Sequence, residues 1–180
     1  MNREQLEQCI NDYGKDIYAF CSQMTHNRQE AEDLYQDTFL KAVELREKID
    51  FENNPKSYLV SIALRLWKNR KRKYAWRARI AGTKQFVEED ASREAEVARP
   101  DHGNPVEEGY LDQELKKKVR EAVKRLDEKY RIPVYLYYTL QLPVSQIADI
   151  MRLSNGAVKS RLHKARNMLK KELEVVLDEM

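Results

Sequence analysis

The chain has 180 residues, of which 42% are hydrophobic and 35% are charged, so it can form small apolar cores beneath a highly charged surface. Its five glycines and five prolines are too few for an all-β protein, which needs many tight turns. No stretch approaches the roughly 20 apolar residues of a membrane span, and the N-terminus lacks the layout of a signal peptide. We therefore expect a cytoplasmic protein without direct membrane insertion.

The net charge of +3 conceals a strong segregation of charge along the chain. Residues 1–54 carry 6 Lys/Arg and 12 Asp/Glu, whereas residues 55–87 carry 10 Lys/Arg and no acidic side chain. Residues 88–114 carry 2 Lys/Arg and 10 Asp/Glu, and residues 115–180 carry 15 Lys/Arg and 8 Asp/Glu. A charge run is often only a solvated helix face, but that explains a 33-residue stretch without a carboxylate poorly. Two basic segments separated by an acidic one predict two surfaces for a polyanion.

The first two elements are expected to be helices with one apolar face each. Residues 3–24 place apolar side chains at helical spacing, with Ile10 among them, although Gly14 weakens a single unbroken helix. Residues 28–49 repeat apolar side chains in a heptad-like stripe. Asn27, with Glu30 three residues later, has the layout of a helix N-terminal cap.

A third helix is expected from Pro55 to about residue 80, because proline is favoured at the first helical position. A polar loop over residues 50–54 precedes it. Its apolar stripe ends near Leu66, and the sequence continues as the basic and aromatic run NRKRKYAWRARI. A helix that packs at one end and becomes basic and aromatic at the other is expected to contact something outside its own domain.

The middle of the chain is expected to be a flexible linker. Apolar periodicity fades over residues 83–106, where acidic residues, Ala, Gly and Pro accumulate, so little apolar surface is available to offset the entropy of ordering. The sequence therefore predicts an all-α fold with two small helical domains, residues 1–82 and 107–180, on either side of this linker. No strand pattern is evident.

Four helical segments are expected in the second half, over residues 107–126, 128–141, 144–151 and 155–177. The first has an apolar stripe that includes Leu115 and Val119. Pro133 lies inside the second segment, so we expect either a kink or a late start there.

The last two segments have the layout of a helix-turn-helix. A short amphipathic helix ends near Met151, a connection of about four residues follows, and Ser154 can cap the basic helix after it. Between Asp149 and Glu172 there are seven Lys/Arg and no acidic residue. The polar side chains on the outer face of the second helix suit phosphates and base edges in a major groove, and they are Lys159, Ser160, Arg161, His163, Lys164 and Arg166. Two packed helices with a solvated basic face remain the alternative.

These residues resemble a known family. SNGAVKSRLHKARNMLK closely resembles the second promoter-reading region of bacterial sigma-70 family RNA polymerase sigma factors, especially the extracytoplasmic-function (ECF) subgroup. The resemblance extends upstream through LDEKYRIPVYLYYTLQLPVSQIADIM. In the first half, HNRQEAEDLYQDTFLKAV resembles the polymerase-binding helix of that family and NPKSYLVSIALRLWKNRKRK its −10-reading helix. The chain departs from the pattern at Arg152, where the family has a glycine, and at Arg65, where many members have an asparagine. Trp67 and Trp76 are also unusually bulky.

The resemblance implies an ECF sigma factor that directs RNA polymerase core to promoters, reading the −10 element as a melted strand and the −35 element as duplex. Asp33, Gln36 and Asp37 would contact the clamp of the largest polymerase subunit. The basic helix of the second domain would bind the −35 element. Residues expected to bind the −10 element are Lys56, Arg65, Lys68, Asn69, Arg70, Lys71 and Arg72. Among these, Asn69 is the expected base contact, while Trp67 is expected either to stack on a base or to be buried.

The partners implied are the polymerase core, through its clamp and flap region, promoter DNA and an anti-sigma factor. Two other classes of protein, a conventional transcriptional regulator and an enzyme, are alternatives to a sigma factor. A conventional helix-turn-helix regulator would share the C-terminal motif but would not require residues 28–73. An enzyme is disfavoured because Asp33 with Asp37 is the only candidate carboxylate pair, and no glycine-rich phosphate loop or His/Cys metal set is present. We expect no cofactor and no metal, and we expect Cys9 and Cys21 to be helix-face or core residues.

Overall fold

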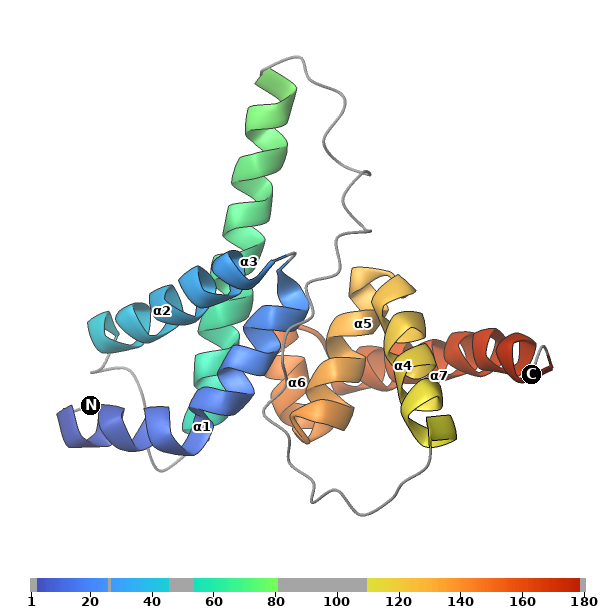
Figure 1. Cartoon of the computed structure of the whole chain (residues 1–180). Helices are drawn as coiled ribbons and strands as arrows, with labels where there is room; N and C mark the ends of the chain where they lie inside the picture. Colours follow the sequence, from blue (N-terminus) through green and yellow to red (C-terminus); the bar gives the residue numbers. More distant parts are fainter. Residues whose placement is uncertain (1–2, 26, 46–53, 81–109, 179–180) are drawn as a thin grey trace. The chain divides into compact units, whose positions relative to one another are not determined.

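The computed structural model describes residues 3–25, 27–45, 54–80 and 110–178, and within these ranges it contains helices and no strand (Figure 1). The predicted all-α fold is confirmed for this part of the chain. The helices group into two compact units, one formed by α1–α3 and the other by α4–α7. The predicted linker over 83–106 lies outside the described residues, as does most of the predicted loop over 50–54. The exact domain bounds therefore stay predictions.

The first unit consists of α1 (Arg3–Met24), α2 (Arg28–Glu44) and α3 (Pro55–Ile80), each of which packs against the other two. Apolar side chains from all three helices form its core. The largest fully buried apolar side chains of this unit are Ile17, Phe20, Leu34, Leu59 and Val60.

Helix α1 is continuous through Gly14, which is itself buried. A Cβ atom at this position would lie 3.0 Å from the hydroxyl oxygen of Tyr35, so the missing side chain lets α1 and α2 approach closely. Glycine lowers the stability of helix α1 itself, but its missing side chain permits this close contact between the two helices. The side chain of Ile10, which continues the apolar stripe of α1, is 39% exposed.

Helix α2 begins at the predicted cap. The backbone N–H of Glu30 donates to Oδ1 of Asn27 at 2.8 Å, and Nδ2 of Asn27 donates to the Glu30 carboxylate at 3.2 Å. The buried Thr38 hydroxyl donates to the carbonyl of Leu34 at 2.6 Å, so this polar group is satisfied inside the core. The helix ends at Glu44, and residues 46–49 of the predicted stripe lie outside the described residues.

Helix α3 has the predicted bounds, and its two ends differ in environment. Its buried side chains occur between Leu59 and Trp67, whereas residues 68–80 are exposed or half-buried. Figure 1 shows the distal part of α3 extending beyond the region where α1 and α2 cover it. This half of the helix presents its side chains to solvent, as the change in composition predicted.

The second unit contains α4 (Tyr110–Arg125), α5 (Glu128–Val134), a π-helical turn η2 (Tyr135–Thr139), α6 (Val144–Met151) and α7 (Asn155–Asp178). Helix α7 packs against α4, α5 and α6. The Arg125 guanidinium also donates to the Glu172 carboxylate at 3.0 Å, which connects α4 to α7. The largest fully buried apolar side chains of this unit are Ile132, Leu136, Leu140, Ile147 and Val158.

Pro133 does not delay the start of its helix. Helix α5 begins at Glu128, runs through the buried Pro133, and continues into the π-helical turn, where the N–H of Leu140 donates to the carbonyl of Tyr135 at 3.1 Å. The late start considered from the sequence was therefore wrong. Proline has no N–H to donate, and the irregularity that follows it is a widened turn.

Candidate nucleic-acid and polymerase interfaces

The connection between α6 and α7 has a tight backbone geometry. Arg152 adopts the left-handed conformation, with φ 56° and ψ 51°. Its N–H donates to the carbonyl of Asp149 at 3.2 Å, and the N–H of Leu153 donates to that of Ala148 at 2.9 Å, which is a Schellman motif. Arg152 thus takes the backbone conformation in which glycine is favoured.

The recognition helix α7 begins with the predicted cap, because Oγ of Ser154 accepts the N–H of Ala157 at 3.2 Å. The inner face is anchored by buried Val158, Leu162 and Ala165. The opposite face carries the six side chains predicted to bind DNA, five of them exposed and Arg161 half-buried. No acidic residue occurs between Asp149 and Glu172, so the chain itself supplies no nearby carboxylate within this segment to neutralise that face.

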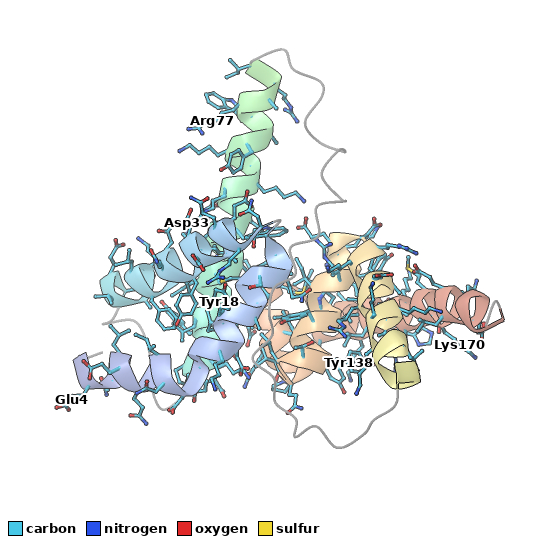
Figure 2. All side chains as sticks on the ribbon, in the orientation of Figure 1. Glu4, Tyr18, Asp33, Arg77, Tyr138 and Lys170 are labelled. Carbon is cyan, nitrogen blue, oxygen red and sulfur yellow. The ribbon has the colours of Figure 1, made fainter. Side chains whose placement is uncertain are left out.

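The predicted polymerase-binding residues lie together on α2. Asp33, Gln36 and Asp37 are exposed, and Asp33 is labelled in Figure 2. The guanidinium of Arg70, on α3, donates to the carboxylate of Asp37 at 2.5 Å and to the backbone carbonyl of Asp33 at 3.1 Å. The structure therefore brings one residue expected to bind DNA into contact with two expected to bind polymerase.

Other side chains on α3 also make contacts within the chain. Arg72 donates to the amide oxygen of Asn69, although both side chains are exposed. Near the start of the helix, Lys56 pairs with Asp16 of α1 at 2.5 Å. Of the residues predicted to bind the −10 element, Arg65 and Lys68 are also exposed.

Trp67 belongs to the core. Only 9% of its surface is exposed, and the ammonium of Lys71 lies 5.2 Å from the centre of its ring. A buried indole has no open face for a nucleobase, so the stacking role considered for Trp67 is excluded. Lys71, by contrast, is exposed on the same helix, where DNA phosphates can approach it.

Both free cysteines are buried. Burial raises the pKa of Cys21 to about 12, although Arg70 and a hydrogen bond with Thr38 act in the opposite direction. Burial and the nearby Asp12 raise the pKa of Cys9. Thiols held in the neutral form are poor nucleophiles and poor metal ligands. Within the described residues, no group of three or more His, Cys, Asp or Glu could hold a metal ion, and no helix is long and apolar enough to cross a membrane.

Two family models match the chain, in the order expected of its two halves. Residues 9–77 match the model described as Sigma-70 region 2, and residues 116–169 match the model described as Sigma-70, region 4. The chain belongs to the sigma-70 family of RNA polymerase sigma factors. The first model covers α2 and most of α3, and the second covers the helix-turn-helix, so the family assignment rests on both candidate interfaces.

Curated relatives place it among the ECF members of that family. It is 28% identical to the ECF RNA polymerase sigma factor SigW of Bacillus subtilis, over 96% of this chain and 90% of the relative. It is also 28% identical to the RNA polymerase sigma-H factor of Pseudomonas aeruginosa, over 99% of this chain and 91% of the relative.

Solved structures give the same fold. The sigma factor RpoE of Bartonella quintana, solved in complex with the anti-sigma factor NepR, is 25% identical with a TM-score of 0.70, covering 94% of this chain and 96% of that one. CnrH, solved with the cytosolic domain of CnrY, is similar in fold at 19% identity and a TM-score of 0.66, covering 97% of this chain and 90% of that one.

Sequence reasoning located the candidate interface helices but missed the contact between α2 and α3. The pairing of Arg70 with Asp37 joins residues 33 positions apart, and no local sequence pattern predicts it. Trp76 was noted only as bulky, whereas its side chain proves to be exposed on the basic half of α3. The signal available in the sequence was its place in the run NRKRKYAWRARI, after the apolar stripe has ended.

Proposed function

We propose that this sigma factor directs RNA polymerase core to specific promoters by reading two DNA elements with two separate helices. The observation that carries the proposal is the presence of one basic, outward-facing helix in each unit. Helix α3 carries nine Lys/Arg and no acidic residue. In α7, the part that precedes Glu172 contains no acidic residue. One matched sigma-70 region covers most of α3, and the other covers α7 as far as residue 169.

The polymerase contact is assigned to the polar face of α2. Asp33, Gln36 and Asp37 lie within about one turn of one another, so all three can meet one surface of the clamp. Their exposure leaves them accessible to a partner. The Arg70 contact fixes the Asp37 carboxylate in position and leaves about half of that side chain accessible, at 51%. A positioned carboxylate loses less side-chain entropy when a partner binds it.

The −10 element is assigned to α3. A melted strand exposes bases and phosphates together, and a basic helix holds the phosphates while a polar side chain reads a base. Asn69 is the proposed base contact, and Lys68, Arg70, Lys71 and Arg72 are proposed to bind mostly backbone. Lys56 and Arg65 complete this set at the start of the helix and on its outer side.

The −35 element is assigned to α7, read as duplex in the major groove. Lys159, Arg161 and Lys164 are proposed to reach bases or phosphates, with shorter-range contacts from Ser160 and His163 and a phosphate contact from Arg166. Each interface alone binds weakly at physiological salt, because much of its affinity comes from phosphates. Tethering the two contacts on one polymerase raises the overall affinity without any new contact.

An anti-sigma factor is proposed as a further partner, because the solved RpoE relative is complexed with one. We place the protein in the cytoplasm, where polymerase and DNA are found, and assign it no catalytic step of its own. The acidic segment over 88–114 is proposed to avoid non-specific DNA through its negative charge.

Run-off transcription with purified core polymerase tests the proposal. Core alone should give no promoter-specific transcript, whereas core with this protein should give transcripts with one defined start site on promoters that it recognises. A conventional helix-turn-helix regulator would bind DNA by itself and would fail to confer specific initiation on core. That result would refute the proposal, because a sigma factor must act through polymerase.

A further inference from the structure

The two tryptophans of the chain occupy opposite environments on the same helix. Trp67 is buried beneath Lys71, whereas Trp76 is 63% exposed on the distal part of α3. Ile80, one turn further along, is also strongly exposed. Together they form an apolar contact surface on the part of α3 that α1 and α2 do not cover. Arg77, labelled in Figure 2, marks this part of the helix, where side chains project into open space.

Trp76 lies in line with the side chain assigned to base reading. Residues three, four or seven apart lie on one side of a helix, so Trp76 shares a side with Asn69 and Arg72. Arg72 already bonds to the Asn69 amide, which keeps these two polar groups together. The exposed aromatic residue Tyr74, two positions before Trp76, points to a different side of α3 because two residues span more than half a turn.

The surroundings of the indole determine what can bind it. The 26 residues of α3 include nine Lys/Arg and no Asp/Glu, so the partner must be strongly anionic. A large flat ring adds a preference for another flat ring, and nucleic acid is the polyanion that offers both. In a duplex the faces of the bases are hidden within the stack, whereas an unpaired base exposes them. The favoured occupant is therefore single-stranded DNA.

We infer that Trp76 stacks on an unpaired base of a DNA strand whose phosphates are held by the basic side chains of α3. The inference rests on the proposed function, in which α3 binds the opened −10 region, and it adds a contact that does not depend on base identity. Every base has a π face, so Trp76 contributes to holding the opened strand while Asn69 supplies selectivity.

The intrinsic fluorescence of the full-length protein tests the stacking directly. We expect a thymidine oligonucleotide of about 16 nucleotides to quench it, because a stacked base contacts the exposed indole. An abasic oligonucleotide of the same length has the same phosphates and should quench little. Trp76→Phe leaves only the buried Trp67 and should abolish the quenching. Equal quenching by the abasic and thymidine strands would overturn the inference, since phosphates alone would then account for the signal.

Affinity for the same thymidine strand, measured by anisotropy of a labelled oligonucleotide, provides a matched comparison. Tyr74 is 64% exposed, nearly the same as Trp76, so alanine at either position removes an equally exposed aromatic ring from one helix. Trp76→Ala should lower the affinity at least about fivefold, Tyr74→Ala less than about twofold, and Trp76→Phe should restore most of the loss. Equal losses for the two alanine variants, or tighter binding to duplex of the same length, would overturn the inference.

Run-off transcription with wild-type protein separates this inference from the proposed function. If wild-type holoenzyme initiates specifically while Trp76→Ala and Tyr74→Ala bind the strand equally well, the stacking role fails and the sigma function stands. If wild-type protein confers no initiation on core, the proposed function fails, whatever the oligonucleotides show.

Discussion

The two helices proposed to read DNA, α3 and α7, differ in how their polar side chains are held. On α3, Arg70 bonds to Asp37 and Arg72 bonds to Asn69, while Lys56 pairs with Asp16. On α7 five of the six side chains are exposed and Arg161 is half-buried, and His163 lies 3.1 Å from the neutral amide of Asn167. The α7 face is thus ready to meet a duplex, whereas the α3 face must exchange contacts within the chain for contacts with DNA.

The difference suits the two DNA forms assigned to the helices. A −35 duplex is present before polymerase arrives, so a preformed face can bind it immediately. A melted −10 strand exists only on polymerase, and the Arg70 contact joins the helix proposed to bind this strand to the helix proposed to bind polymerase. Exposed ion pairs contribute only about 0–1 kcal/mol, so these contacts restrain α3 without blocking it.

The largest expected effect is at Asp37. Asp37→Arg should weaken binding to polymerase core by about 1–3 kcal/mol in a titration, because a carboxylate is lost and a like charge replaces it. The substitution also sets two arginines against each other, so its control is the swap Asp37→Arg with Arg70→Asp, which restores an internal pair. The swap should recover thermal stability but not core affinity. Recovered core affinity would mean that the ion pair between positions 37 and 70, and not a carboxylate at position 37, supports binding to core.

On α7, Arg161→Ala should reduce affinity for −35 duplex by about 1–3 kcal/mol where it reads a guanine, and should relax the preference at one or two base pairs. Lys164→Ala is the comparison on the same face. As a phosphate contact it should weaken binding to all sequences alike and reduce the salt dependence. Competition binding with mutated −35 sequences distinguishes the two. An unchanged preference in Arg161→Ala would remove it from the base-reading set.

A smaller effect is expected on α3, where the polar groups are already engaged. Asn69→Ala should change which −10 sequences the holoenzyme transcribes, because a base contact carries sequence information. Lys71→Ala should lower transcription from every promoter by a similar factor and reduce its sensitivity to salt. If Asn69→Ala lowers all promoters equally, Asn69 serves only to hold Arg72.

Sequence periodicity located the helices well because each buries an apolar stripe of its own. The start of α2 followed from Asn27, the start of α3 from Pro55 and the start of α7 from Ser154, each of which acts locally. Burial was less predictable. Leu115 and Val119 continue the apolar stripe of α4 yet are exposed, at 40% and 36%. A stripe shows which side of a helix is apolar, but neighbouring helices determine how far along it burial extends.

The candidate interfaces show the same difference between features set by local sequence and features set by packing between helices. The exposed face of α7 could be predicted from the sequence because charge and helical spacing are both local properties. The pairing of Arg70 with Asp37 was not, because it depends on how α2 and α3 pack. The buried position of Trp67 was equally undecided, since its spacing fits the core stripe while its neighbours are basic.

The smallest effect concerns the turn before α7. Arg152 adopts a left-handed backbone that costs an L-residue roughly 1–2 kcal/mol, and glycine removes this cost but adds entropy to the unfolded chain. Arg152→Gly should therefore stabilise the second unit by about 0.5–1 kcal/mol in denaturant unfolding. Arg152→Ala keeps the backbone cost and serves as the control. Equal stability of the two variants would show that the turn carries no such strain.

One polymerase-bound chain is proposed to read two different promoter elements, with α3 and with α7. The most direct measurement is sequencing of transcripts made by core polymerase with this protein from a library randomised at both elements. Selected promoters should share two conserved elements at one fixed separation, with Asn69→Ala altering only the −10 preference and Arg161→Ala only the −35 preference. Selection of a single palindromic site, bound equally well without core, would contradict the reading of two elements by a polymerase-bound chain.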